Sequence, residues 1–287
     1  MIESVAIVGT GLIGGSIGLA LRRVGFAGEI VGIDASEVEV STALATGAIS
    51  RIGGFDDAVS ADLVVLAVPV MGILDWMKRL APAMRPGQLI TDVGSTKLSI
   101  CAAAQAGYNG EGQARFLPGH PMAGKESGGA AQAEALLFDG ATWLFTPVGA
   151  EVGAEAGLEA EWRGWVTKFG ARTMDLDAAR HDQICAWVSH LPQMVSTAMS
   201  AMFEDEFAAE PEVAAEFRAI GGRALREMTR LGASPYSMWR DVAFTNTTPL
   251  AATLFALEQR LAHVRENLKT PQLREEFEKA NAFRKER

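Results

Sequence analysis

Cysteine is scarce in this chain of 287 residues, which contains only Cys101 and Cys185. Two cysteines are too few for the disulfide framework of a small secreted domain, and their spacing is not that of a metal site. We therefore expect a protein of the reducing cytoplasm that holds no metal ion.

Long apolar runs and a surplus of basic residues are missing as well. The longest apolar run, LVVLAVPVMGIL, spans about a dozen residues, fewer than the ~20 that a membrane-spanning helix needs. The formal net charge of -9 disfavours nucleic acid and anionic membranes as partners, because both attract basic surfaces. The N-terminus places the acidic Glu3 before a glycine motif, where a signal peptide would have a basic region. We expect a soluble protein with no nucleic-acid or membrane partner.

What the chain does contain, between residues 4 and 177, is an alternation of short apolar segments with longer segments of helical spacing. The predicted strands are SVAIVG, EIVGID, DLVVLAV, QLITDV and TWLFTP, and ARTMDLD is a candidate for one more. Because these strands are apolar throughout and helices lie between them, the pattern predicts an α/β fold. Its doubly wound, Rossmann-type parallel sheet would be covered on both faces.

After residue 177 the strand pattern stops. Three long segments follow with apolar residues at three- and four-residue spacing, and they are rich in Ala and Met with narrow polar faces. We predict a dinucleotide-binding domain over residues 1–177 and an all-helical domain over residues 178–287. Because so much apolar helix surface needs a partner, we also predict a homodimer through the helical domain.

A glycine motif directly after the first strand points to a dinucleotide. Gly9, Gly11 and Gly14 have the G-x-G-x-x-G spacing, and Leu12 and Ile13 open the following helix. The first glycine permits a tight turn, the second lets the backbone approach a pyrophosphate, and the third lets helix and strand pack closely. The helix N-terminus supplies N–H groups and a positive dipole end to the phosphates. The alternative is a glycine-rich turn used only for packing.

An acid and an apolar turn extend this cofactor prediction. Asp34 ends the second strand, twenty residues after Gly14, where a carboxylate bonds the adenine ribose hydroxyls. A carboxylate repels a 2′-phosphate, so NAD is favoured over NADP. The SEVEV segment that follows has no Arg to bind a 2′-phosphate, which leaves that role to a distant side chain. Val68 and Pro69 end another strand and would lie beside the nicotinamide ring.

Two further segments carry candidate chemistry. In TDVGSTK, Ser95 is either the N-cap of the next helix or a hydroxyl facing the ligand crevice. In FLPGHPMAGKESGG, the Gly and Pro residues predict a loop that holds His120 in one place. His120 is either a satisfied core histidine or a base that accepts a proton while hydride leaves for the cofactor.

Five segments follow one another along nearly the whole chain: VGTGLIGGS, DVGSTK, GHPMAGKESG, SHLP and TRLGASPYSMWRD. In this order they resemble the prephenate dehydrogenase family, which includes the arogenate and cyclohexadienyl dehydrogenases of tyrosine biosynthesis. The resemblance implies a nucleotide-binding domain followed by a helical dimerisation domain. It also implies an oxidative decarboxylation: hydride passes from C4 of a cyclohexadiene to NAD, the C4 hydroxyl proton passes to a base, and carbon dioxide leaves.

The resemblance also implies roles for individual residues. His120 matches the base that bonds the C4 hydroxyl, Ser95 helps to hold that hydroxyl and the nicotinamide, and Arg230 matches the residue that binds the ring carboxylate. Three more residues match positions at the site: His190, Trp239 and Glu126. The resemblance places Glu126 in a gating ion pair. The alternative for Trp239 is a core anchor.

The chain departs from the family at Gln193, where many members have a second His in the motif SHLPH. Glutamine forms hydrogen bonds but carries no charge. Glu227 lies three residues before Arg230, and we expect it to meet an ammonium on the substrate, or to orient that Arg, unless it points to solvent.

We expect no C-terminal regulatory module. The competing functions are another two-domain enzyme, such as a β-hydroxyacid dehydrogenase or imine reductase, and a cofactor-binding regulator without turnover.

Overall fold

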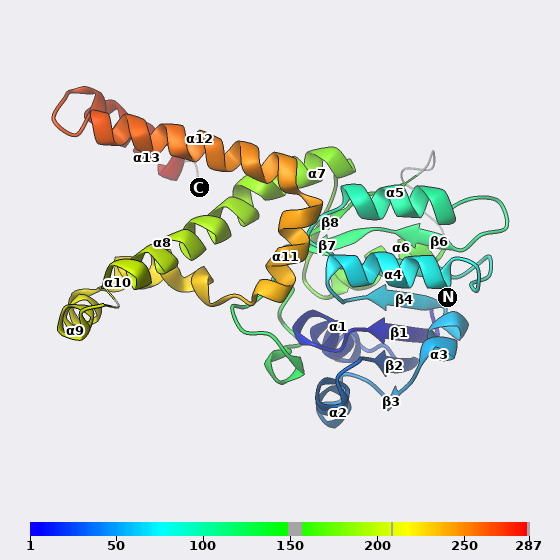
Figure 1. The fold of residues 1–287 in the computed structure, drawn as a ribbon. Helices are drawn as coiled ribbons and strands as arrows, with labels where there is room; N and C mark the ends of the chain where they lie inside the picture. The colour runs from blue at the N-terminus through cyan, green and yellow to red at the C-terminus, as the bar shows by residue number, and fades with distance from the viewer. Residues whose placement is uncertain (149–156, 208, 286–287) are drawn as a thin grey trace.

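The computed structural model describes residues 1–148, 157–207 and 209–285, with an α/β part from which several helices project (Figure 1). Its main sheet has six parallel strands in the order β3-β2-β1-β4-β5-β6. In chain order these are β1 Ser4–Val8, β2 Glu29–Ile33, β3 Arg51–Ile52, β4 Leu63–Leu66, β5 Leu89–Asp92 and β6 Arg115–Leu117. This strand order is that of dinucleotide-binding folds, so the predicted fold class is confirmed.

Helices cover both faces of this sheet, as the apolar strands predict. The helices are α1 Leu12–Arg23, α2 Glu37–Ala45, α3 Phe55–Ser60, α4 Val70–Leu80, α5 Leu98–Gly107 and α6 Leu158–Lys168. Val5 and Ile7 of β1 belong to one buried cluster, and Ala6 and Val8 belong to another. Because successive side chains of a strand point to opposite faces, the two clusters are the two cores of a doubly wound sheet.

A second sheet changes two of the sequence predictions. It has the order β7-β8-β9, formed by Gly119–Pro121, Thr142–Phe145 and Arg172–Asp175. Strand β8 pairs antiparallel with β7 and parallel with β9, so TWLFTP is a strand but does not belong to the parallel sheet. The predicted loop at His120 is wrong, because His120 pairs with Leu144 in β7. Pro121 is tolerated because β7 is an edge strand.

Past β9 the described residues contain only helices and turns. The α-helices are α7 Ala178–Cys185, α8 Leu191–Phe207, α9 Pro211–Ile220, α10 Arg223–Thr229, α11 Tyr236–Thr245, α12 Thr247–Glu266 and α13 Gln272–Lys285. A π-helix, Ala186–His190, joins α7 to α8, and a 3-10 helix, Arg230–Ala233, follows α10. Asp177 caps α7 by accepting a hydrogen bond from the Arg180 N–H (2.9 Å). We propose the domain boundary just after this cap, at residue 177.

Two carboxylates of the helical part bind helix N-termini of the α/β part. Asp182 of α7 accepts the N–H groups of Lys97 (2.7 Å) and Leu98 (2.9 Å) at the start of α5. Asp241 of α11 accepts the N–H of Met71 (3.1 Å) at the start of α4. A carboxylate at a helix N-terminus satisfies free N–H groups and complements the helix dipole. Accordingly α7 lies beside α5, and α11 beside α4 (Figure 1). These contacts set the helical part against the carboxyl ends of the strands.

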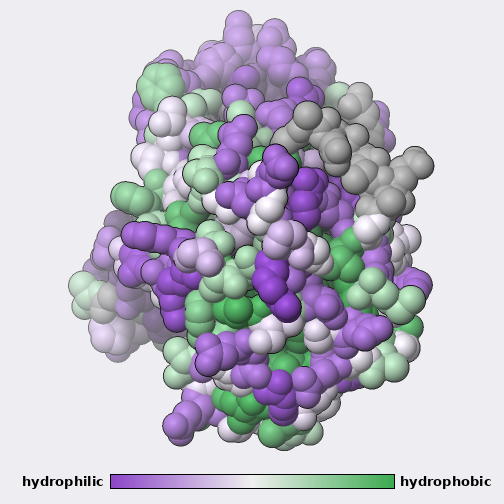
Figure 2. Space-filling view, turned by 90° about the vertical axis from the view of Figure 1, so that its right-hand side faces the viewer, coloured by the Kyte–Doolittle hydropathy of each residue, from purple (hydrophilic) through white to green (hydrophobic). Residues whose placement is uncertain are grey.

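The face of the α/β part opposite the projecting helices is mixed in character (Figure 2). Figure 2 shows hydrophilic and hydrophobic residues interspersed over the face of the α/β part that is turned away from the projecting helices. Among the residues that the structure describes, no helix combines the length and the apolar character needed to cross a membrane. A cytoplasmic location stays a prediction.

Candidate active site

The glycine turn forms an open cradle at the start of α1. Gly9 has φ +88°, and a Cβ there would collide with the carbonyl of Ala67. A Cβ at Gly14 would collide with the carbonyl of Gly9, whereas one at Gly11 would meet nothing within 4 Å. The turn, the packing contact and the open approach therefore fall on the three glycines as the motif predicts. The N-cap of α1 is Gly11, which brings no side chain, so the cradle fits a pyrophosphate.

Asp34 lines a cavity of about 580 Å³ next to this cradle, together with Gly9, Gly11, Val68 and Pro69. Its Oδ2 accepts hydrogen bonds from the Thr10 N–H (2.7 Å) and hydroxyl (3.2 Å), and its Oδ1 accepts one from the Ser36 N–H (2.9 Å). These bonds fix the carboxylate in one orientation, and Oδ1, which accepts only one of them, keeps a further lone pair for a ribose hydroxyl.

The same cavity is lined by a positively charged side chain that the sequence analysis missed. Arg79, in the last turn of α4, lines it, and its guanidinium carbon lies 4.6 Å from the centroid of the Trp76 ring. Trp76 and Arg79 are three residues apart, so helical spacing alone places them on one face of α4. Only the sheet topology places that face opposite Asp34. An arginine that is far from Asp34 in the sequence therefore lines the same cavity as the predicted ribose-binding carboxylate.

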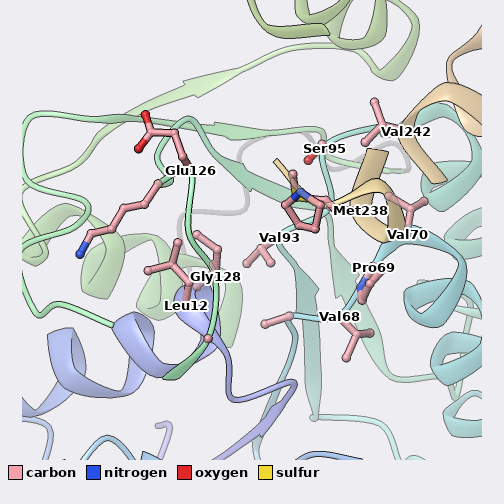
Figure 3. Close-up of a pocket in the computed structure, with 16 residues that line it drawn as sticks. Leu12, Val68, Pro69, Val70, Val93, Ser95, Glu126, Gly128, Met238 and Val242 are labelled. Carbon is pink, nitrogen blue, oxygen red and sulfur yellow. The ribbon is translucent and has the colours of Figure 1, made fainter. Parts of the chain in front are cut away.

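A second cavity, of about 240 Å³, adjoins the first and shares Ala67, Val68 and Pro69 with it. Its walls are mostly apolar: Leu12, Val68 and Val93 come from the α/β part, and Met238 approaches from α11 (Figure 3). A flat ring that packs through its faces fits such a lining, so the residues present suit a nicotinamide.

A third cavity, of about 390 Å³, shares Leu12, Ile13, Val93 and Ser95 with the second. Its volume falls within the ~300–1,000 Å³ that is usual for small-molecule sites. Six of the residues predicted to bind or act on the substrate line it: Ser95, His120, Glu126, Gln193, Arg230 and Trp239. The three cavities thus follow one another from Asp34 to His120 along the carboxyl edge of the sheet.

His120 heads a hydrogen-bonded chain of buried side chains. Its Nδ1 lies 2.9 Å from Nε2 of His181, and Nδ1 of His181 lies 2.8 Å from Oδ1 of Asp182. A carboxylate only accepts, so the Nδ1–H of His181 donates to Asp182 and its Nε2 accepts from His120 Nδ1. His120 therefore carries its proton on Nδ1, and its Nε2 keeps a lone pair for a ligand.

Burial keeps this lone pair available at neutral pH. Desolvation lowers the pKa of His120 well below its ordinary value, and electrostatic interactions with His181, Lys97 and His190 lower it further, because a proton on His120 would lie near the charge of Lys97 and near any proton on the two histidines. The neutral form is the one that can accept a proton, so His120 is in the protonation state that the predicted base needs. Sequence reasoning missed His181 and Asp182, because α7 is brought against β7 only by the tertiary fold.

A fully buried ion pair anchors the Ser95 turn. Lys97 Nζ lies 2.6 Å from Oδ2 of Asp92, and both side chains are 0% exposed. Lys97 also donates to the carbonyl of Gly94 (2.6 Å), while Asp92 accepts the N–H of Gly119 (3.2 Å), next to His120. The pair thus ties the turn to β7. The N-cap of α5 is Lys97, so the N-cap alternative for Ser95 is wrong.

Arg230 forms an ion pair with Glu126 across the mouth of the third cavity. Arg230 comes from the 3-10 helix after α10, and Glu126 comes from the segment that follows β7. Half-exposed charges of this kind exchange readily, because water screens them. The guanidinium is therefore free to exchange Glu126 for another carboxylate, as the predicted role of Arg230 requires.

Two family models match the chain. The model described as "Prephenate dehydrogenase, nucleotide-binding domain" matches residues 17–159, and the one described as "Prephenate dehydrogenase, dimerization domain" matches residues 177–281. The chain belongs to the prephenate dehydrogenase family. This confirms the resemblance seen in the sequence segments.

Members of the prephenate dehydrogenase family are similar over most of the chain. A prephenate dehydrogenase of Lactococcus lactis is 33% identical over 85% of this chain, which spans 65% of that protein's length. The structure of an Aquifex aeolicus prephenate dehydrogenase, in complex with hydroxyphenyl propionate and NAD+, covers 100% of this chain and 96% of its own at 28% identity, with a TM-score of 0.82. A Synechocystis arogenate dehydrogenase covers 99% of both chains at 26% identity, with a TM-score of 0.77.

The departure from the prephenate dehydrogenase family at Gln193 has a structural role. Gln193 is buried, and its amide donates hydrogen bonds to the carbonyl of Leu231 (2.7 Å) and the hydroxyl of Thr197 (3.1 Å). Both amide hydrogens are used, so Gln193 fixes the backbone beside Arg230 and presents only its carbonyl oxygen to a ligand.

The prediction for Glu227 is wrong. Its carboxylate pairs with Arg223 (2.6 Å) on the exposed side of α10 and does not line the cavity. The prediction assumed one continuous helix, but α10 ends at Thr229 and Arg230 begins a 3-10 helix, which turns the two side chains apart. The exposed alternative holds for Glu227.

His190 stands behind the cavity instead of lining it. The side chain is fully buried, its Nδ1 lies 3.1 Å from the Asn246 amide nitrogen, and its ring packs edge-on against Trp239. Burial lowers the pKa of His190 to about 4. A neutral histidine in this place supports Trp239, which does line the cavity.

Proposed function

We propose that this protein catalyses the NAD-dependent oxidative decarboxylation of prephenate to 4-hydroxyphenylpyruvate, and that it also accepts arogenate, which would yield tyrosine. The observation that carries the proposal is His120 in a cavity that also contains Arg230 and that adjoins the apolar cavity. The complex of the Aquifex enzyme with NAD+ and the arogenate dehydrogenase of Synechocystis support it.

In this proposal the residues divide the reaction between them. NAD, held over the glycine cradle and Asp34, supplies the hydride acceptor. His120 Nε2 takes the proton of the C4 hydroxyl, and Ser95 orients that hydroxyl. The charge that develops on His120 is stabilised by Asp182 through His181. Arg230 binds the ring carboxylate in exchange for Glu126 and positions the ring for loss of carbon dioxide.

The direct test is an assay of the purified protein with NAD and either prephenate or arogenate, followed by the absorbance of reduced nicotinamide. Reduction of NAD that depends on the substrate is expected with both prephenate and arogenate. Failure to reduce NAD with both substrates, in a protein that binds NAD, would overturn the proposal and favour a cofactor-binding regulator.

For the cofactor, we expect NAD to be preferred over NADP and Asp34→Ala to lower the ratio of the two kcat/KM values by about tenfold or more. A hydrogen bond to a charged group contributes about 1.5–3 kcal/mol, and the carboxylate also repels a 2′-phosphate. Arg79 stays in the cavity and attracts that phosphate, so Arg79→Leu added to Asp34→Ala should cancel the gain with NADP. Faster reduction of NADP than of NAD by the wild type would contradict the role of Asp34.

For the substrate, we expect Arg230→Leu to raise KM about 10- to 100-fold, the effect of losing a charge-assisted hydrogen bond. The factor should be the same for prephenate and arogenate, because both have the ring carboxylate. Glu227→Gln is the matched control, since Glu227 lies only three residues before Arg230 but pairs with Arg223 outside the cavity. Equal KM values for Arg230→Leu and the control would remove Arg230 from substrate binding.

We also propose that two copies pair through the helical domain. Large apolar side chains are exposed there, among them Phe244 at 72% and Phe255 at 61%, and the matching family model is described as a dimerization domain. Surface of this kind is costly to leave in water. Light scattering at micromolar concentration should give twice the chain mass of 30.5 kDa, and a monomeric mass would contradict the proposal.

A further inference from the structure

Three potential metal ligands meet beneath the third cavity. Nδ1 of His120 lies 2.9 Å from Nε2 of His181, and Sγ of Cys185 lies 3.6 Å from Nε2 of His181 and 4.0 Å from Nδ1 of His120. All three residues are buried. We propose that this triad, His120, His181 and Cys185, is a site for Zn²⁺ or a similar borderline-soft cation, and that its occupation inhibits the enzyme.

The spacing of the triad suits a tetrahedral ion. With Zn–N bonds of about 2.0–2.1 Å and Zn–S bonds of about 2.3 Å, two nitrogens lie about 3.3 Å apart and a nitrogen and a sulfur about 3.6 Å apart. The observed separations differ from these by about half an ångström or less, which small rotations of the side chains absorb. Three protein ligands leave the fourth position for solvent.

Two neighbouring features also fit a metal site. His181 and Cys185 are four residues apart on α7, so the helix itself presents both ligands on one face. Nδ1 of His181 is bonded to Asp182, the outer partner that metal-bound histidines usually have. The sequence expectation of no metal compared only the two cysteines with each other and so overlooked this His–Cys pair.

The competing explanation is that the triad is only a hydrogen-bonded pair of histidines beside a buried thiol. The two explanations differ in what Cys185 does. When a cation binds, the thiol gives up its proton to solvent and the thiolate bonds the metal, whereas a merely buried thiol stays protonated. A probe that reports thiolate coordination therefore separates them.

Inhibition follows from the tautomer of His120, and this step rests on the proposed function. A cation on Nδ1 occupies the nitrogen that carries the proton in the hydrogen-bonded chain. The single proton of the neutral ring then moves to Nε2, which becomes a donor. In that state His120 has no lone pair for the C4 hydroxyl proton, so the cation blocks the base without filling the substrate cavity.

The site itself is tested without turnover. Protein treated with a chelator and then titrated with Co²⁺, in the absence of substrate and NAD, should show thiolate-to-cobalt charge-transfer absorption that saturates at one ion per chain and is displaced by Zn²⁺. Cys185→Ser and Cys185→Ala should both lose it, and Cys101→Ser, the only other cysteine variant the chain offers, should keep it. Absence of the band in the wild type, or its persistence in the Cys185 variants, would overturn the site.

The consequence is tested by turnover. Zn²⁺ should inhibit the wild type and Cys101→Ser alike, and a chelator should restore activity. In Cys185→Ser the concentration for half-inhibition should rise at least about 100-fold, because losing a ligand costs more than losing an outer partner, which costs about 10–100-fold. Equal inhibition of the wild type and the Cys185 variant would place the effect at another site. A cobalt band in a protein without dehydrogenase activity would instead contradict only the proposed function.

Discussion

Replacing His120 by Asn is expected to lower kcat by about two to four orders of magnitude, the usual contribution of a general base. Asparagine keeps a polar side chain in β7 but cannot take a proton, and it ends the hydrogen-bonded chain to His181 and Asp182. His120 lines neither of the two cofactor cavities, so NAD binding measured by calorimetry should be unchanged.

His263→Asn is the matched control, because His263 lies on α12 near Glu276 and away from the cavities. The pH profile gives a second measure. Burial lowers the pKa of His120, and the neutral form is active, so the acid limb of kcat/KM in the wild type should fall below the ordinary histidine value of about 6.5. Near-normal turnover of His120→Asn, or an acid limb at or above that value, would remove His120 from the mechanism.

Replacing Lys97 by Met is expected to lower the free energy of unfolding by about 3–5 kcal/mol. Removing one partner of a buried ion pair leaves the other charge without compensation, and Asp92 is as deeply buried as Lys97. The loss should also loosen the Ser95 turn and β7, because Asp92 bonds both through the N–H groups of Gly94 and Gly119.

Denaturant unfolding measures this effect. Lys78→Met is the control, because Lys78 is an exposed lysine on α4 and such changes usually stay within about 0.5 kcal/mol. Adding Asp92→Asn to Lys97→Met removes the stranded charge and should recover part of the stability. A loss below about 1 kcal/mol for Lys97→Met would mean that the pair is not the anchor of this turn.

The cofactor end of the site was predictable because the residues that form it are close together in the sequence or end adjacent strands. The three glycines and the helix start lie within six residues, from Gly9 to Gly14, and Asp34 ends the adjacent strand. Glycine acts here through its backbone, because a residue without a Cβ permits a positive φ and close contacts that other residues do not. The residue type therefore indicates the backbone conformation directly. The structure accordingly finds a clash for a side chain at the first and third glycines and open space at the second.

The errors arose where a local rule met a long-range constraint. Pro and Gly around His120 predicted a loop, but an edge strand tolerates Pro, and β8 was there to pair with it. Glu227 was placed beside Arg230 by helical spacing, but α10 ends between them. In both cases the residue types were compatible with two structures, and the neighbouring element decided between them.

By itself the sequence determined the fold class, the helical second half and the residues of the glycine cradle, because hydrophobic periodicity and backbone freedom act over a few residues. Only the tertiary structure decided that His181 and Asp182 stand behind His120, that Lys97 is buried against Asp92, and that Arg79 faces Asp34. His120 and His181 are separated by 61 residues, and the contact between them exists because α7 packs over α5 at the sheet edge. No periodicity in a sequence specifies which distant side chains meet, since that depends on how the layers pack.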